Sequence, residues 1–250
     1  MVSTGLDMLN YKINNMDNVQ DSYTLFHKQK VSHHLYPTEW VIRTMLGKYP
    51  QLKLDKSNYN GGNILDLGFG DGRNMKLLAN CGLTVSGVEI TQETVDLVKK
   101  SMELLEVTAD LRVGSNTSIP FGDAYFDYIL ASSACYYIDG NSSFDDNMNE
   151  IKRVLKTGGS LIANFPAFVA NSDVEQSFIL QNATRLEDDH IIVGGDIYGL
   201  RNGYKFKAFD SVEKLTHYFE KDFTNISVGV CMDNYYGVQI NQFILTAQKK

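Results

Sequence analysis

Short apolar runs alternate with segments of helical spacing over most of the chain from residue 63 onward. Five of these runs have the length and composition of buried strands. The predicted strands are 63–68 (NILDLG), 84–89 (TVSGVE), 109–113 (ADLRV), 126–131 (FDYILA) and 160–165 (SLIANF). Their alternation with helices predicts a parallel sheet that is covered by helices on both faces.

Apolar residues spaced three or four positions apart predict the helices between these strands. A first helix is expected to begin near Thr38, which follows Pro37 and can cap the helix with its hydroxyl. Thr91 can cap a later helix in the same way. Further helices are predicted over 73–80, 91–105, 147–155 and 212–219.

The last part of the chain departs from this alternation. Residues 225–230 and 238–248 have strand patterns close enough to pair as a hairpin, whereas residues 166–210 are polar and aromatic with no clean period. A long insertion after a fifth strand is expected to cover the carboxyl edge of the sheet, where such folds bind ligands. We therefore expect an N-terminal arm with a lid helix over 1–62 and a main domain over 63–250, with a cap at about 166–210.

Composition narrows the classes of protein to consider. The chain of 250 residues is 43% hydrophobic and 21% charged, as a globular protein with a real core would be. The net charge of −7 and the absence of a basic stripe argue against a nucleic-acid partner.

The N-terminus has no apolar segment of a signal peptide, and no apolar run approaches the roughly 20 residues that span a bilayer. Three scattered cysteines show no metal-binding spacing. We expect a cytoplasmic protein with no membrane partner and no metal.

The most informative segment is the glycine-rich turn between the first strand and its helix, ILDLGFGDGR over residues 64–73. Its spacing is G-x-G-x-G, and Arg73 stands where a dinucleotide fingerprint would place its third glycine. Asp66 at the strand end would repel a pyrophosphate and attract an ammonium group. Glu89, at the end of the second strand, can accept hydrogen bonds from ribose hydroxyls. The turn therefore favours S-adenosylmethionine (SAM) over NAD.

Four segments in this order resemble the class I SAM-dependent methyltransferases, in particular the small-molecule branch with a methyltransferase-11/25 type domain. They are ILDLGFGDGR, VEIT, GSNTSIPFGDAYFDYILASSACYYI and LKTGGSLIANFP, and the resemblance covers about residues 36–165. It implies an α/β Rossmann-like fold, in which a seven-stranded, mostly parallel sheet has its last strand antiparallel and helices on both faces. An N-terminal lid and a cap after the fifth strand complete the expected fold.

The resemblance also implies which residues hold the cofactor. Asp66 and the glycines would take the methionine end, Glu89 the ribose and Ile90 the adenine. The family often has an acid after the third-strand Gly114, but this chain has Ser115, Asn116 and Thr117 instead. The implied cofactor residues are Tyr36, Arg43, Asp66, Gly68, Gly70, Gly72, Glu89, Ile90, Ser115, Asn116, Thr117 and Ser132. Tyr36 and Arg43 enter through a YPxE-like segment, for which an ordinary helix start is an equal alternative.

Candidates for the acceptor side come from the cap and from the segment after the fourth strand. Tyr137 and His190 are the predicted catalytic residues, although a packed aromatic and a surface-loop histidine are the open alternatives. The predicted substrate-binding residues are Tyr136, Phe168, Tyr198 and Arg201. His33 and His34 can contribute from the lid, and Lys205 and Lys207 can join Arg201 in holding an anion.

These observations predict a methyltransferase that transfers the methyl group of SAM to an oxygen or nitrogen of a small polar metabolite, leaving S-adenosyl-L-homocysteine. A sugar derivative, a phosphoryl compound and an amine all fit the polar, aromatic cap, and the protein is expected to be a monomer or homodimer. Two alternatives stay open at this point: a SAM-binding regulatory or subunit protein without catalysis, and an NAD-dependent oxidoreductase.

Overall fold

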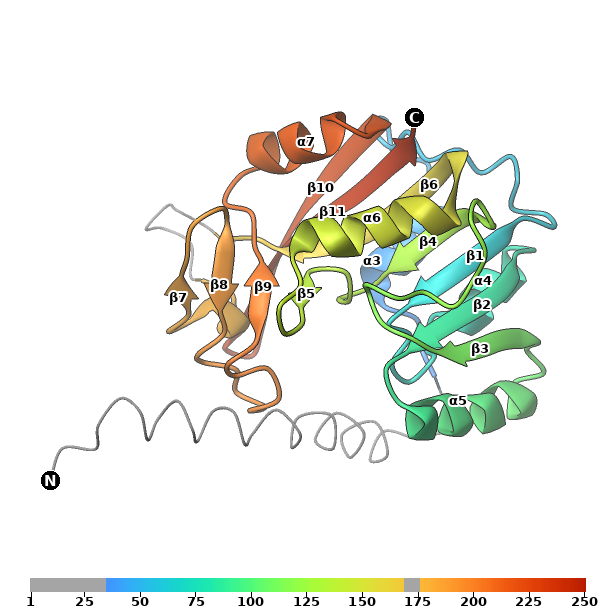
Figure 1. Ribbon diagram of the computed structural model, residues 1–250, viewed down its shortest axis with the longest axis horizontal. Helices are drawn as coiled ribbons and strands as arrows, with labels where there is room; N and C mark the ends of the chain where they lie inside the picture. Colours follow the sequence, from blue (N-terminus) through green and yellow to red (C-terminus); the bar gives the residue numbers. More distant parts are fainter. Residues whose placement is uncertain (1–34, 169–175) are drawn as a thin grey trace, which may run out of the picture.

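The computed structural model describes residues 35–168 and 176–250, and a seven-stranded sheet forms its centre (Figure 1). The strand order is β10-β11-β6-β4-β1-β2-β3. The strands are β1 (Asn63–Leu67), β2 (Thr84–Glu89), β3 (Ala109–Val113), β4 (Phe126–Ala131), β6 (Leu155–Pro166), β10 (Phe223–Tyr235) and β11 (Val238–Lys249).

Strand directions confirm the predicted fold class. β1 pairs in parallel with β2 and β4, β2 with β3, and β4 with β6. The last strand, β11, runs antiparallel to both β6 and β10. All five strands expected from the first part of the pattern are present, and the terminal hairpin extends beyond its predicted ends.

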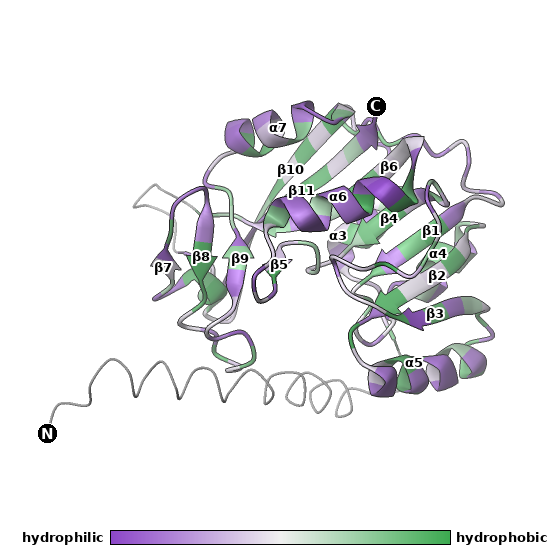
Figure 2. Ribbon diagram, viewed as in Figure 1, coloured by the Kyte–Doolittle hydropathy of each residue, from purple (hydrophilic) through white to green (hydrophobic). Residues whose placement is uncertain are grey.

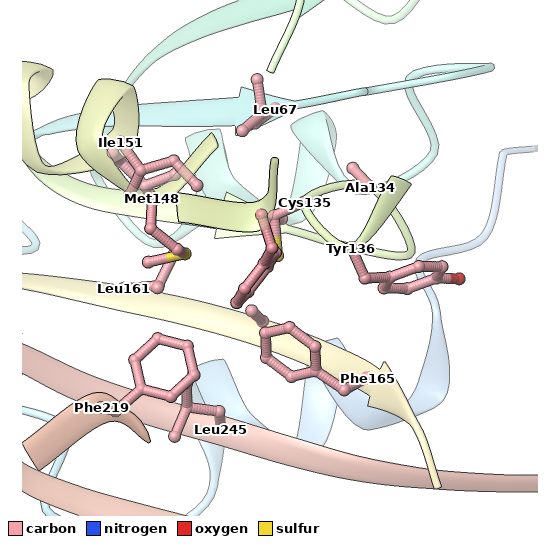
Figure 3. Packing of buried hydrophobic residues seen from close by; sticks show 14 of the residues in the cluster. Leu67, Ala134, Cys135, Tyr136, Met148, Ile151, Leu161, Phe165, Phe219 and Leu245 are labelled. Carbon is pink, nitrogen blue, oxygen red and sulfur yellow. The ribbon is translucent and has the colours of Figure 1, made fainter. Parts of the chain in front are cut away.

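Helices cover both faces of the sheet, and each face has its own hydrophobic core. The helices are α3 (Glu39–Leu46), α4 (Met75–Asn80), α5 (Gln92–Leu104), α6 (Phe144–Val154) and α7 (Val212–Glu220). Alternation along β4 shows the division, because Ile129 packs in the core of α6 and α7, whereas Tyr128 and Leu130 pack in the core of α3, α4 and α5. Figure 3 shows part of the first core, with Met148 and Ile151 of α6 and Phe219 of α7. Figure 2 shows the central strands as largely hydrophobic and the helices as mixed, as amphipathic helices on a buried sheet should be.

Side-chain caps begin α5, α6 and α7, whereas Thr38 precedes α3 without the predicted hydrogen bond from its hydroxyl and α4 has no side-chain cap. The hydroxyl of Thr91 accepts the N–H of Thr94 at 3.2 Å, as the predicted cap of α5 requires. The prediction that the next helix begins at Asn147 was wrong, because Ser143 and Asp146 form a capping box that starts α6 at Phe144. α4 starts at Met75, two residues later than predicted.

The segment predicted to be irregular contains a second sheet. Its four strands have the order β5-β9-β8-β7, and every pairing is antiparallel. They are β5 (Tyr137–Ile138), which lies ahead of that segment, and β7 (Thr184–Arg185), β8 (His190–Ile192) and β9 (Lys205–Lys207) within it. A short helix η1 (Phe178–Leu180) precedes β7. Figure 1 shows this small sheet beside the edge to which the arrowheads of β1 and β4 point. None of the helices in the described ranges is long and apolar enough to cross a membrane.

Candidate functional site

A cavity of about 550 Å³ opens at the carboxyl edge of the large sheet. Its walls come from the loops after β1, β2, β3 and β4, from the segment around β5 and from the cap. Predicted site residues that line it are Gly68, Gly70, Glu89, Ile90, Ser115, Asn116, Ser132, Tyr137, Tyr198 and Arg201. The structure thus brings the residues expected at the cofactor and those expected at the acceptor into one space.

The glycine turn forms the floor of the cavity. Gly68 and Gly70 have φ angles of 65° and 57°, in the left-handed region that glycine adopts most easily. The N–H of Gly68 donates to the carbonyl of Val88 at 2.9 Å, which ties the turn to β2. A Cβ atom on Gly68 would lie 2.6 Å from Cβ of Ala134 in the loop after β4. Only a residue without a side chain leaves room at this point of the floor.

Three polar residues of the same turn were not predicted as site residues and also line the cavity. Arg73 donates two hydrogen bonds to the carboxylate of Asp71, from Nε at 2.8 Å and from Nη2. Asn74 accepts the N–H of Thr38 at 3.0 Å through Oδ1. That bond fixes the start of α3 to the cavity rim. In the sequence these residues stand together in the tetrapeptide DGRN, but the pairing of Arg73 with Asp71 depends on the conformation of the turn.

Glu89 ends β2 with its carboxylate in the cavity wall. Loss of water around it raises its pKa, and the N–H groups of Ile90 and Gly70, which donate to the carboxylate, oppose that shift. Two fixed donors hold the carboxylate in place. A carboxylate fixed beside the glycine turn can accept both hydroxyls of a ribose.

The third-strand residues lie beside Glu89. The N–H of Gly114 donates to the carbonyl of Glu89 at 3.0 Å, and Asn116 follows two residues later. Nδ2 of Asn116 donates to the carbonyls of Ala134 at 3.0 Å and Tyr137 at 3.3 Å. Asn116 therefore braces the loop that leads to the acceptor side, and its amide oxygen remains an acceptor of the kind that an adenine amino group needs.

The cap contributes Tyr198 and Arg201 through a buried aspartate. Asp196 has a fully buried carboxylate that accepts the N–H groups of Tyr198, Leu200 and Arg201 at 3.0–3.1 Å. Nη1 of Arg201 pairs with the same carboxylate at 3.1 Å, and its Nε donates to the Tyr137 hydroxyl at 3.2 Å. The loop thus folds around the Asp196 carboxylate, which also holds the Arg201 guanidinium at the cavity wall.

Asp139 and Tyr204 line the acceptor end as well, and no sequence motif singled them out. Asp139 is exposed at the rim of the cavity, and the groups packed against it raise the pKa of its carboxyl by partial loss of water. Burial and the charge of Asp139 raise the pKa of Tyr204 to about 12. Asp139 is brought to the cavity by β5, a two-residue strand that sequence periodicity cannot detect.

Asp66 lies behind the floor of the cavity and is not a lining residue. It is 1% exposed, and neither carboxylate oxygen has a hydrogen-bond partner among the residues that the structure describes. Burial, with the charges of Asp71 and Glu89, raises its pKa to about 8. A buried carboxyl without a donor is chemically unsatisfied, and a bound cation or donor beyond the floor would stabilise its charged form.

Besides Asp66, four predicted cofactor residues lie outside the cavity wall. Gly72 packs against α5, where a Cβ would meet Cγ1 of Val98 at 2.6 Å. Thr117 is exposed and pairs with Ser115 at 3.2 Å. Tyr36 is 76% exposed. Arg43 pairs with Glu39 on the surface of α3 and lines a separate cavity between α3 and the β10–β11 hairpin.

Three predicted acceptor residues are also corrected. His190 sits in β8 with Nδ1 at 3.1 Å from the Glu187 carbonyl, and burial lowers its pKa. Tyr136 is a core residue 6.4 Å from the ring of Phe165 (Figure 3). Phe168 packs under the guanidinium of Arg185. None of the three lines the cavity.

Two further expectations concern Lys207, as a partner of Arg201, and the two histidines of the N-terminal lid. Lys207 is buried and donates to the carbonyl of Asp188, so it does not join Arg201. His33 and His34 lie outside the described residues.

The arrangement fits a nucleoside that carries an amino acid and a positive charge. The ionisable lining residues comprise three carboxylates, on Asp71, Glu89 and Asp139, against the two guanidiniums of Arg73 and Arg201. An excess of carboxylates disfavours a pyrophosphate and favours a sulfonium with an ammonium group. The space over Gly68 suits the amino acid part of such a ligand. The Asp66 carboxyl, which has no hydrogen-bond partner among the described residues, favours its positive charge.

Comparison with known proteins gives a consistent result. Residues 65–163 match the family model described as a methyltransferase domain, and no curated protein sequence matches the chain. A solved protein of Pyrococcus horikoshii OT3 is 18% identical with a TM-score of 0.57, over 88% of this chain and 97% of its own.

Two further solved structures are similar over most of the chain. A SAM-dependent methyltransferase from Methanosarcina mazei is 21% identical with a TM-score of 0.54, over 82% of this chain and 99% of its own. A Thermotoga maritima methyltransferase, described as a possible histamine N-methyltransferase, is 17% identical with a TM-score of 0.52, over 96% and 99%. At these identities the likeness is one of fold.

Proposed function

We propose that this chain, whose residues 65–163 match a methyltransferase domain, is a SAM-dependent methyltransferase whose acceptor is an oxygen or nitrogen of a small polar metabolite. One observation carries the proposal. The cavity that starts at the glycine turn and Glu89 continues without a break to Tyr137, Tyr198 and Arg201 of the acceptor end. Cofactor and acceptor would therefore meet inside one enclosure.

The size of this enclosure supports a small acceptor. Its volume of about 550 Å³ lies within the range of roughly 300–1,000 Å³ typical of small-molecule sites. The acceptor end is walled by three tyrosines, Tyr137, Tyr198 and Tyr204, which offer both apolar rings and hydroxyls. A polar metabolite with a short carbon skeleton suits such walls better than a lipid chain or a polymer.

Each part of the site has a role in this proposal. The backbone at Gly68 and Gly70 receives the methionine part of the cofactor, Glu89 holds its ribose, and Ile90 covers its base. SAM, when bound, supplies an electrophilic methyl group. The cap excludes water, and the bond between Tyr137 and Arg201 fixes a hydroxyl at the acceptor end.

Transfer of a labelled methyl group tests the proposal. The purified protein is incubated with SAM labelled in its methyl group and a metabolite extract, and products are identified by mass spectrometry. A labelled small molecule that depends on the protein is the expected result. The Glu89→Gln variant, which keeps the shape of Glu89 without its charge, should give much less product. Label found only in protein or nucleic acid would contradict a small-molecule acceptor.

A further inference from the structure

We propose that the acceptor end of the cavity binds an ammonium group, with Asp139 as its counter-ion and the rings of Tyr137 and Tyr204 as its walls. The inference rests on the proposed function and narrows it, because it selects amines from the polar metabolites considered above. It assigns a role to Asp139 and Tyr204, which the sequence did not single out.

Two tyrosine rings form a corner at this end of the cavity. The centroids of Tyr137 and Tyr204 are 5.7 Å apart, and their planes meet at 73°. Tyr137 is held from behind by Phe206 at 4.3 Å and by Tyr136, on which it stacks at 5.1 Å. Ring faces attract cations through their quadrupoles, and walls that are fixed before binding keep that attraction directed at the ligand.

Asp139 adds a negative charge to the corner. None of the hydrogen bonds and ion pairs between described residues engages its carboxylate, although Asp139 lines the cavity with Tyr137 and Tyr204. Its charge acts on the hydroxyl of Tyr204. A carboxylate that lines the same cavity as two tyrosine rings offers the combination that binds an alkylammonium group.

The neighbouring guanidinium does not cancel this charge. Arg201 is already paired with the fully buried carboxylate of Asp196 at 3.1 Å, so the two contribute no net charge. Asp139 therefore leaves the acceptor end negative. A phosphoryl or carboxylate acceptor would meet repulsion there, whereas an ammonium would be attracted.

Asp139 also suits the proton chemistry of an amine. An ammonium group has no free electron pair, so it must release a proton before its nitrogen can act as a nucleophile. The N–H bond of the ammonium breaks, its electrons stay on nitrogen, and the proton passes to the carboxylate oxygen. The same displacement of water that raises the pKa of Asp139 makes it a better proton acceptor.

A pair of probes of equal size tests the inference. 2-Phenylethylamine carries an ammonium and 2-phenylethanol a hydroxyl, and both are titrated by calorimetry into the full chain saturated with S-adenosylhomocysteine at pH 7.5. We expect the amine to bind at least tenfold more tightly than the alcohol. Asp139→Asn and Tyr204→Leu should each remove most of that preference.

The control variant is Asp123→Asn, which makes the same change of charge three residues before β4, at the opposite edge of the sheet. It should keep the preference, and all variants should bind S-adenosylhomocysteine within about twofold of wild type. Equal affinity of the wild type for amine and alcohol, with normal cofactor binding, would overturn the inference and leave the proposed function standing. Loss of cofactor binding in Asp139→Asn would also overturn it. A wild type that does not bind S-adenosylhomocysteine would contradict the proposed function itself.

Discussion

At the scale of single residues, we expect Glu89 to hold the ribose of the cofactor. Its carboxylate faces the cavity and is held by the N–H groups of Ile90 and Gly70, so its orientation is set before any ligand arrives. A hydrogen bond to a charged group contributes roughly 1.5–3 kcal/mol. A group that is both charged and fixed in place loses little freedom when it binds a ribose.

We predict that Glu89→Gln weakens the binding of S-adenosylhomocysteine by about 10- to 100-fold, since roughly 1.4 kcal/mol corresponds to a factor of ten. Calorimetry with the purified variants measures the change. Glu103→Gln, an exposed position of α5 that does not line the cavity, is the matched control and should bind as wild type does. Equal loss in both variants would mean that overall charge, and not a contact with the ribose, governs binding.

Asp66 acts on stability through its proton. The folded protein holds this proton up to about pH 8, whereas an unfolded chain releases it near the ordinary value of about 3.9. Between these values the folded state binds more protons than the unfolded state. The stability of the ligand-free protein therefore falls as pH rises through this window, by at most about 1.4 kcal/mol per pH unit for one group.

We predict that Asp66→Asn removes this part of the pH dependence and is more stable than wild type at pH 8. Denaturant unfolding of both proteins at pH 5, 6.5 and 8 measures the difference, in which other titrating groups cancel. The gain in stability should grow from pH 5 to pH 8. A constant difference, or a wild type that gains on the variant as pH rises, would mean that the Asp66 carboxyl is charged in the folded protein.

At the scale of elements, the connection between β1 and α4 has two steric requirements at one position. Gly68 combines a φ of 65° with a contact that leaves no room for a Cβ. Gly61 has a φ of 86° but nothing within 4 Å of an added Cβ. Comparing Gly68 with Gly61 separates the cost of backbone strain, roughly 1–2 kcal/mol, from the cost of a clash with an added Cβ.

We predict that Gly68→Ala lowers both stability and affinity for S-adenosylhomocysteine, because the turn must move away from Ala134. Gly61→Ala should lose about 1–2 kcal/mol of unfolding free energy and keep its affinity unchanged. Denaturant unfolding and calorimetry give the two quantities for each variant. Unchanged affinity in Gly68→Ala would show that the floor of the cavity tolerates a side chain.

The cap loop is organised by Asp196, which accepts three backbone N–H groups and one guanidinium. We predict that Asp196→Asn loosens the loop, because an amide has one acceptor oxygen in place of two and adds donors. Trypsin should cut faster after Arg201, as followed by mass spectrometry of timed digests. Asp210→Asn, which lies outside the cavity wall and pairs with Arg185 and Lys214, is the control for a lost ion pair. Equal cleavage rates in all three proteins would contradict the role of Asp196.

The strands show which parts of the fold could be predicted from the sequence. The strands β1, β2, β4 and β6 were predictable because each contains an apolar run buried on both faces, whereas β3 is an edge strand in which only Leu111 is buried. The small sheet was not predictable, since β5 and β7 have two residues each and β8 and β9 have three. Such strands are too short to show an alternation of apolar and polar residues in the sequence, and only their pairing in the folded chain defines them.

The same reason explains the errors in the site. Residues next to the ends of long strands, such as Glu89, were correctly expected at the cavity because the carboxyl ends of parallel strands share one edge. Residues of the cap depend on which strand face they occupy, and a shift of one residue reverses that face. In the segment before the cap, Tyr136 is buried in the core and its neighbour Tyr137 lines the cavity, although their rings stack on each other.

At the scale of the whole molecule, one cavity joins the turn after β1 to the cap, so a ligand that fills it binds the folded chain and not the unfolded one. Such a ligand at 100 times its Kd stabilises the fold by about 2.7 kcal/mol. For a chain of this size each kcal/mol corresponds to roughly 2–4 °C in Tm. We predict a rise of roughly 5–11 °C in Tm with S-adenosylhomocysteine and none with NADH, because the excess of carboxylates in the wall repels a pyrophosphate.

Thermal unfolding with each ligand measures both shifts in Tm. Arg43→Ala should show the full rise, because Arg43 faces the other cavity, and Glu89→Gln a smaller one at the same ligand concentration. A larger rise with NADH would mean that the turn after β1 accepts a pyrophosphate despite its spacing and its charge.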